Sequence, residues 1–306
     1  MTGFDIGARH VGDGCPCFIM AEVGQAHDGS FGNAHAYIDA IAKTGADAVK
    51  FQCHIADAES WPDEPWRVVP EWPQDKTRFD YWRRMEFSRD QWWSLAAHAD
   101  AKGLEFLCSP FSEEAVKILD PLVDAWKVPS GEVKNQPLLG AIAATGKPVI
   151  LSTGMCTELE WSKAYDYFAP NVRSLHCTSL YPCPPERLDL GRIAWQRGAG
   201  FSDHSGTIYA GLAAVALGCD ILEVHVCWSK EQFGFDTAAS ITIEDLRRLV
   251  EGVRFIERAK TPVDKDELAK ELAPMRELFM DRLKGAPHRG GEAVLAGVLA
   301  HQRGDK

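Results

Sequence analysis

Two lysines interrupt stretches of sequence that are otherwise apolar and strand-like. Lys50 lies within residues 48–53, and Lys127 lies within residues 125–130. A lysine buried in such a stretch is costly unless an anion accompanies it. Serines end several similar stretches: Ser109, Ser130, Ser152, Ser179 and Ser202. Ammonium and hydroxyl donors suit phosphate and carboxylate groups, so the pattern predicts an anion site. The alternative is that each lysine only pairs with a structural glutamate.

Two histidines end consecutive strand-like stretches, His204 after residues 200–203 and His225 within residues 220–226. Neighbouring strands lie about 4.8 Å apart, so both imidazoles could bind one metal ion. With oxygen donors such as water, Glu22 or a substrate completing the shell, the metal would be divalent Mn, Mg or Co rather than structural zinc. The alternative is a pair of hydrogen-bonded core histidines.

Eight strand-like segments alternate with helical segments along the chain. Eight such units within about 240 residues favour a closed (β/α)8 TIM barrel, in which the chemistry lies at the carboxyl ends of the strands. Neither GxGxxG nor GxxxxGK[ST] follows a strand, which argues against nucleotide-binding folds. The predicted strands are 18–24, 48–53, 105–110, 125–130, 148–152, 172–177, 200–203 and 220–226, and the predicted helices are 33–43, 88–102, 112–119, 136–145, 157–167, 188–195, 208–217 and 243–258.

Three segments fall outside this alternation. Residues 1–17 are expected to form an N-terminal hairpin that plugs the bottom of the barrel, which occupies residues 18–260. Residues 54–87 contain Trp61, Trp66, Trp72 and Trp82. A loop of this length is often functional, so it is a candidate lid, unless its tryptophans simply pack on the barrel. Residues 261–306 form a C-terminal tail.

Composition excludes several classes of protein. The 306 residues are 45% hydrophobic, which is typical of a globular protein and not of a disordered one. A net charge of −11 argues against binding to nucleic acid or to an anionic membrane. The sequence shows neither a signal peptide nor an apolar run of about 18 residues. Nine scattered cysteines predict reduced thiols and hence a cytoplasmic protein.

Six motifs resemble those of the sialic acid (nonulosonic acid) synthase family. They are AEVGQAHDG at 21–29, GADAVKFQ at 45–52, KVPSGE at 127–132, LSTGM at 151–155, LHCTSLYP at 175–182 and FSDHS at 201–205. Members of this family join phosphoenolpyruvate (PEP) to an open-chain N-acetylated amino sugar and release phosphate. The resemblance implies the same reaction here, a divalent metal (Mn²⁺ first, with Mg²⁺ or Co²⁺ as alternatives), and PEP and an amino sugar as the binding partners.

The resemblance also implies roles for individual residues. His204 and His225 would hold the metal, and Glu22 would orient water or the sugar hydroxyls, with Glu132 as the second candidate. Lys50, Ser109, Lys127, Ser130, Ser152 and Ser202 would hold PEP, with Ser179 standing where some members have Asn. Glu22, Gln52, Glu132, Tyr181 and Asp236 would meet the acceptor.

The sequence departs from the family mainly around the acceptor and at the C-terminus. Where the family usually has Asn, Thr, Pro and His, this chain has Ala26, Cys53, Phe235 and Thr237. Family members usually continue into an antifreeze-like domain that packs over the partner's barrel and gives an arginine to the N-acetyl group. Residues 275–301 resemble only the beginning of that domain, which we expect to be truncated here. Arg282, Arg289 and Arg303 are candidate substitutes, and a homodimer stays open.

Two alternatives remain open at the level of sequence. A synthase of the 3-deoxy-octulosonate phosphate type would take a phosphorylated acceptor and would place an extra cation at the far end of the pocket. A catalytically silent barrel that acts as a binding or scaffold protein in a sugar pathway would be expected to have a broken metal pair, yet His204 and His225 are both present.

Overall fold

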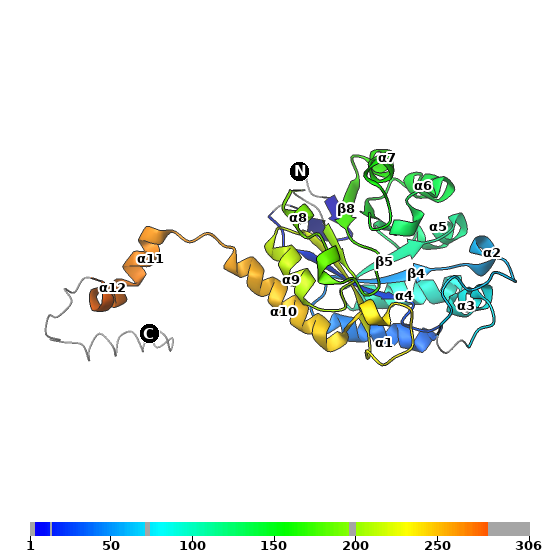
Figure 1. Cartoon of the computed structure of the whole chain (residues 1–306), viewed down its shortest axis with the longest axis horizontal. Coiled ribbons are helices and arrows are strands. Elements are labelled where there is room, and N and C mark those ends of the chain that lie inside the picture. The colour runs from blue at the N-terminus through cyan, green and yellow to red at the C-terminus, as the bar shows by residue number, and fades with distance from the viewer. Residues whose placement is uncertain (1–3, 13, 71–73, 196–199, 281–306) are drawn as a thin grey trace. The chain divides into compact units, whose positions relative to one another are not determined.

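The computed structural model describes residues 4–12, 14–70, 74–195 and 200–280. Eight parallel strands form a nearly closed barrel with helices between them, which confirms the predicted (β/α)8 fold (Figure 1). They pair in the order β5-β4-β3-β10-β9-β8-β7-β6, and β5 and β6 are neighbours where the ring closes. The strands are β3 (Phe18–Gly24), β4 (Ala48–Cys53), β5 (Glu105–Pro110), β6 (Trp126–Val128), β7 (Val149–Ser152), β8 (Val172–His176), β9 (Gly200–Asp203) and β10 (Ile221–Cys227).

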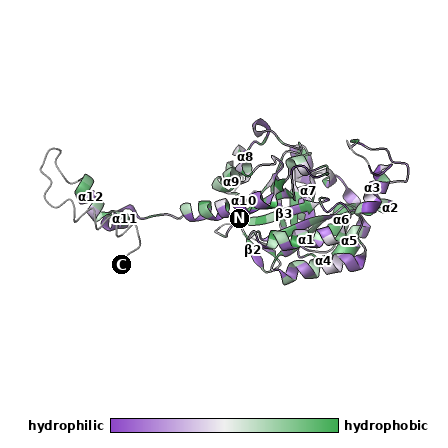
Figure 2. Cartoon of the chain, turned by 90° about the horizontal axis from the view of Figure 1, so that it is seen from below, coloured by the Kyte–Doolittle hydropathy of each residue, from purple (hydrophilic) through white to green (hydrophobic). Residues whose placement is uncertain are grey.

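The helices follow the strands at the places that the sequence predicts. Ser88 and Thr157 are the N-caps of α4 and α7. The hydroxyl of each accepts a hydrogen bond from a backbone N–H of the first turn, and each belongs to a capping box. Helices such as α4 and α5 carry both apolar and hydrophilic residues, as helices with one face on the barrel must (Figure 2). They are α1 (Phe31–Ala42), α4 (Arg89–Ala101), α5 (Glu113–Leu119), α6 (Gln136–Ala143), α7 (Glu158–Phe168), α8 (Gly191–Trp195), α9 (Tyr209–Ala216) and α10 (Ile243–Ala259).

Several boundaries differ from the prediction. Strand β6 ends at Val128, because Pro129 has no N–H to donate and the chain then turns into the 3-10 helix η1 (Ser130–Glu132). Helix α8 begins at Gly191 rather than at Leu188, after a separate 3-10 turn, η2 (Pro185–Arg187). A further 3-10 turn, η3 (Thr237–Ala239), precedes the short strand β11 (Ile241–Thr242), which pairs with β10 and was not predicted.

The N-terminal residues form the expected hairpin. Strands β1 (Phe4–Ile6) and β2 (Arg9–Val11) pair in antiparallel fashion. The buried side chains of Ile6 and Val11 form one apolar cluster with residues in or next to the barrel strands: Phe18, Met20, Ala48, Leu107, Ala125, Ile150, Leu175 and Ile221. The hairpin therefore closes the amino-terminal end of the barrel with apolar side chains.

We expect Ile6→Ala to lower the free energy of unfolding by about 2–5 kcal/mol, because it opens a cavity in this plug. Ile6 is fully buried. Denaturant unfolding followed by circular dichroism measures the change. Leu159→Ala, at a side chain that is 64% exposed on α7, is the control and should shift stability by less than about 0.5 kcal/mol. An equal, small effect of both substitutions would show that the hairpin does not plug the barrel.

The tryptophan-rich segment 54–87 is partly folded on itself. It contains α2 (Ala56–Glu59) and α3 (Arg78–Met85). Ala56, Tyr81, Trp82 and Met85 form a small buried cluster, with the partly buried Trp66 and Phe79 against it. Trp61, by contrast, is 57% exposed, and Trp72 lies outside the described residues.

The chain divides into two compact units, Met1–Arg258 and Ala259–Lys306. In the described part of the second unit, α11 (Lys265–Glu271) and α12 (Ala273–Phe279) are two short helices. Arg282, Arg289, Arg303 and most of the stretch that resembles an antifreeze-like domain lie outside the described residues. Among the described helices, none combines the length and the apolar character needed to cross a bilayer.

Candidate active site

A cavity of about 360 Å³ lies at the carboxyl ends of the barrel strands. The strands place these side chains there by simple alternation, because every second residue of a barrel strand points inward. On β4, for example, inward Ala48 is followed by Lys50 and Gln52. The predicted site residues that line the cavity are Glu22, Lys50, Gln52, Ser109, Lys127, Ser130, Ser152, Ser179, Tyr181, Ser202, His204, His225 and Asp236.

Two lysines and two glutamates form a buried, charge-balanced group in this cavity. Lys50 Nζ lies 2.5 Å from Glu22 Oε2 and 3.2 Å from Glu223 Oε1, and Lys127 Nζ lies 3.5 Å from Glu223 Oε2. None of the four side chains is more than 4% exposed. Each lysine therefore pairs with a glutamate, as the alternative expects, and each also lines the cavity, so the anion site stays a prediction.

The pairing sets the proton affinities of this group. Burial alone would lower the pKa of Lys50, but the carboxylates of Glu22 and Glu223 raise it above its ordinary value. Burial lowers the pKa of Lys127, and its pairing with Glu223 offsets this only in part. Burial would raise the pKa of Glu223, but both lysines hold it well below its usual range. Glu223 is therefore a carboxylate at neutral pH.

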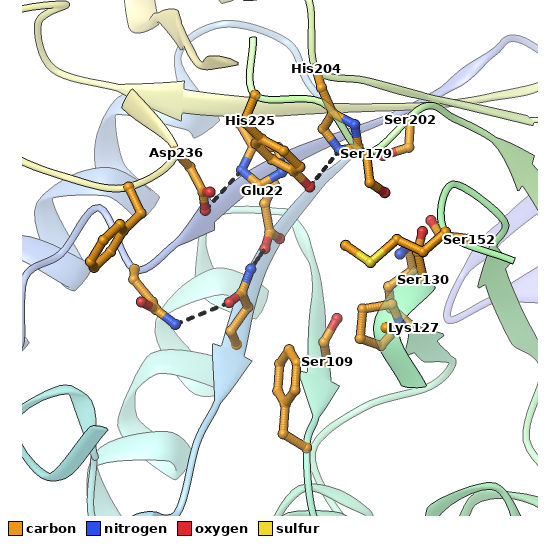
Figure 3. Close-up of a pocket in the computed structure, with 18 of the residues that line it drawn as sticks. Glu22, Ser109, Lys127, Ser130, Ser152, Ser179, Ser202, His204, His225 and Asp236 are labelled. Atoms are coloured by element: carbon orange, nitrogen blue, oxygen red, sulfur yellow. Dashed lines mark hydrogen bonds and ion pairs between the residues drawn. The ribbon is translucent and has the colours of Figure 1, made fainter. Parts of the chain in front are cut away.

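Serine hydroxyls stand beside the lysines. Lys50 Nζ donates to Ser109 Oγ at 3.1 Å, and Ser130 Oγ accepts from the Gly154 N–H at 2.9 Å. Ser152 Oγ is buried and has no hydrogen-bond partner in the described part of the chain. Figure 3 shows Ser130, Ser152 and Lys127 together on one side of the cavity. A buried hydroxyl without a partner, on the same side of the cavity as an ammonium group, is a donor that could serve an anion.

His204 and His225 face each other across the neighbouring strand ends. Their ring centroids are 5.4 Å apart. His204 Nδ1 lies 2.9 Å from the Thr178 carbonyl oxygen and so donates to it, which leaves Nε2 as the acceptor. The Tyr181 hydroxyl donates to that Nε2 at 3.0 Å. Burial and the nearby His225 lower the pKa of His204 to about 4, so its imidazole is neutral at pH 7.

These donors fit a divalent metal that shares its shell with oxygen atoms. A ligating histidine usually donates its second N–H to a carbonyl, as His204 does to Thr178. Asp236 Oδ2 lies 3.6 Å from His225 Nδ1, and Figure 3 shows His225 between Asp236 and His204. Within the described ranges, no three His, Cys, Asp or Glu side chains converge on one metal position. Water or substrate oxygens would therefore complete the shell.

A series of hydrogen-bonded amide and carboxylate groups connects Lys50 to Tyr81 of α3. Gln52 Nε2 donates to Glu22 Oε1 at 2.8 Å, and Gln25 Nε2 donates to Gln52 Oε1 at 3.2 Å. The Tyr81 hydroxyl of α3 in turn donates to Gln25 Oε1. Glu22 is thus fixed on both sides, by Lys50 and by Gln52.

Glu132 is the predicted site residue that the structure does not bring to the cavity. It lies in η1 and does not belong to the lining. Its Oε2 instead accepts from Asn135 Nδ2 at 2.7 Å, at the start of α6 (Gln136–Ala143). The tight turn after Pro129 directs the backbone away from the strand direction, and the alternation that places Lys127 no longer applies to Glu132.

Several residues that line the cavity were not among the predicted site residues. Glu223 could have been found, because it stands two positions before His225 on the same strand and so faces the same way. The residues of the 54–87 segment could not, because no period places an irregular loop. They are Trp66, Arg67, Val68, Arg78, Tyr81 and Trp82, and Gln25, Phe111, Pro129, Gly131, Met155 and Phe235 complete the wall.

Comparison with known proteins gives the family. The NeuB family model matches residues 37–265. N-acetylneuraminate-9-phosphate synthase of Homo sapiens is 36% identical over 278 residues, covering 87% of this chain and 77% of the human protein. N,N'-diacetyllegionaminic acid synthase of Legionella pneumophila is 32% identical over 303 residues, covering 92% and 85%.

A solved structure agrees with these relatives. The crystal structure of N-acetylneuraminic acid synthetase from Leptospira borgpetersenii, in complex with citrate, superposes with a TM-score of 0.77 at 26% identity, covering 92% of this chain and 98% of that one. Named relatives and fold point to the same chemistry. The chain belongs to the NeuB family and is a C–C bond-forming synthase of the nonulosonic acid type.

Proposed function

We propose that this cavity holds PEP and an open-chain N-acetylated amino sugar side by side and assigns each to one set of residues. One observation carries the proposal: a lysine pair with hydroxyls and a histidine pair line the same cavity. The lysine side suits an anionic substrate, and the histidine side suits a metal and a carbonyl.

PEP is proposed to bind on the lysine side. Its phosphate and carboxylate carry up to three negative charges, and Lys50 and Lys127 are the buried cations available to them. The hydroxyls of Ser109, Ser130, Ser152, Ser179 and Ser202 would donate to the PEP oxygens, with Ser152 contributing the hydroxyl that has no partner in the described structure.

The metal is proposed to bind at His204 and His225, with Asp236 close to His225. Synthases of this type are generally metal-dependent. We propose Mn²⁺, with Mg²⁺ or Co²⁺ as alternatives, because two imidazoles with oxygen donors suit such ions. A bound divalent ion would supply Lewis-acid polarisation of a carbonyl oxygen.

The acceptor is proposed to lie between Glu22, Gln52, Tyr181 and Asp236, with its C1 aldehyde toward the histidines. The C2–C3 π electrons of PEP form the new bond to acceptor C1, and the aldehyde oxygen takes up a proton. Water then adds at C2 and loses a proton, for which Glu22 is the candidate group. The C2–O bond breaks, inorganic phosphate leaves, and C2 becomes the ketone of the product.

The setting of the reaction is also a proposal. All nine cysteines are free thiols, which suits a reducing cytoplasm and a protein that needs no disulfides. A homodimer stays a prediction. The relatives leave the acceptor open, since the human enzyme is named for a phosphorylated product and the Legionella enzyme for one without phosphate.

Phosphate release tests the proposal. The full chain is incubated with PEP, Mn²⁺ and a panel of 2-acetamido and 2,4-diacetamido hexoses, and inorganic phosphate is followed with time. We expect release that requires one acceptor and the metal, and that stops when the metal is chelated. No release with any acceptor, together with no binding of PEP by calorimetry, would contradict the proposal.

A further inference from the structure

Two arginines line the cavity at a place that neither the PEP side nor the metal side uses. Arg67 and Arg78 come from the 54–87 segment, Arg78 from the start of α3. Their side chains are 71% and 21% exposed, so both reach solvent while facing the cavity. In the described part of the chain, no other arginine lines this cavity.

The two arginines share a single carboxylate. Arg78 NH1 lies 2.6 Å and Arg67 NH2 lies 3.0 Å from the same oxygen, Oε1 of Glu64. The Glu64 side chain is 3% exposed, so it is a fixed anchor. Two guanidinium charges against one carboxylate leave one positive charge in excess, and each guanidinium has five N–H donors, most of them uncommitted here.

Their neighbours on α3 are different. Arg83 pairs with both Asp57 at 2.7 Å and Glu86 at 3.0 Å. Arg84 likewise pairs with Asp28 and Asp75. Arg83 and Arg84 thus have two carboxylates each and do not line the cavity, whereas Arg67 and Arg78 share one carboxylate and do line it.

A series of contacts separates this charge from the lysines. Lys50 pairs with Glu22, Glu22 accepts from Gln52, and Gln52 Oε1 lies 3.3 Å from His54 Nε2. The His54 ring stacks on Trp82 with centroids 3.8 Å apart, and the Arg78 guanidinium lies over the Trp82 ring at 5.1 Å. In this series four side chains, Glu22, Gln52, His54 and Trp82, separate Arg78 from Lys50.

We propose that Arg67 and Arg78 bind an anionic group, a phosphate monoester or a carboxylate, at the end of the acceptor remote from its aldehyde. This inference rests on the proposed function, because that function places the aldehyde at the histidines and PEP at the lysines. A neutral hydroxyl would not need two guanidiniums with an unbalanced charge, whereas an anion accepts from both in charge-assisted hydrogen bonds.

The test compares three acceptors of one stereochemistry: the neutral 2-acetamido hexose, its 6-phosphate and its 6-carboxylate. We expect one of the anionic acceptors to exceed the neutral one at least tenfold in kcat/KM. R67Q/R78Q should lower kcat/KM for that acceptor at least tenfold more than for the neutral acceptor, mainly through KM. R83Q, at an arginine of the same helix outside the cavity, is the matched control and should change neither.

Other outcomes would overturn the inference. Equal kcat/KM for neutral and anionic acceptors would do so, and so would a loss in R67Q/R78Q that is the same for all three. Calorimetric binding of the same three acceptors to the PEP-loaded chain gives the preference even if none turns over. Absence of turnover with all acceptors would count against the proposed function, whereas absence of an anion preference in binding would count against the inference.

Discussion

His225→Ala is expected to lower turnover at least about 1000-fold, while the barrel stays folded. The substitution removes one of two imidazoles whose centroids are 5.4 Å apart. With it goes the stabilisation that the proposed metal would give to developing charge on the aldehyde oxygen, worth several kcal/mol. Phosphate release at saturating Mn²⁺ measures turnover, and titration with Mn²⁺ measures metal binding, which should weaken in parallel.

His176→Ala is the matched control. His176 ends strand β8, which β9 separates from β10, and its Nε2 contacts the Leu188 carbonyl oxygen at 2.8 Å, so it does not line the main cavity. We expect it to keep turnover within a few-fold of the unsubstituted chain. Retained turnover and retained Mn²⁺ affinity in His225→Ala would show that His225 only packs the core.

Glu223→Gln is expected to lower the free energy of unfolding by about 3–5 kcal/mol, because it leaves a buried lysine charge without its carboxylate. Glu223 lies 3.2 Å from the Lys50 ammonium and 3.5 Å from the Lys127 ammonium. The amide keeps the size of the side chain, so the effect reports charge and not a cavity. Urea unfolding at pH 7 measures it.

Glu231→Gln, at an exposed position after the same strand, is the control and should change stability by less than about 0.5 kcal/mol. PEP should raise the midpoint of unfolding of Glu223→Gln more than that of the unsubstituted chain, since an anion replaces the missing charge. An equally small loss of stability in both variants would mean that the buried charges do not depend on one another.

Much of the barrel and its site could be predicted from sequence, because both follow from alternation. Lys50, Ser109 and Lys127 stand at inward positions near the carboxyl ends of their strands, so the eightfold pattern brings them together without further information. The hairpin was predictable for a related reason, since the end of a barrel must be closed by apolar side chains such as Ile6.

The remainder depends on contacts between residues far apart in sequence. Glu132 leaves the cavity because the chain turns into a 3-10 helix after Pro129. Arg78 reaches the mouth because α3 packs Tyr81 and Trp82 into a cluster of its own and stacks Trp82 on His54. The alternation of residues along a strand or helix does not specify such packing. The positions of the 54–87 residues that line the cavity therefore could not be predicted from the sequence.

The product of the reaction tests the central claim most directly. The full chain is given Mn²⁺, an accepted amino sugar and PEP labelled with ¹³C at C3, and the products are analysed by mass spectrometry and NMR. We predict an acid longer than the acceptor by three carbons, with the label bonded to the former aldehyde carbon and one phosphate released per molecule. Phosphate released with labelled pyruvate, and no new C–C bond, would contradict the account.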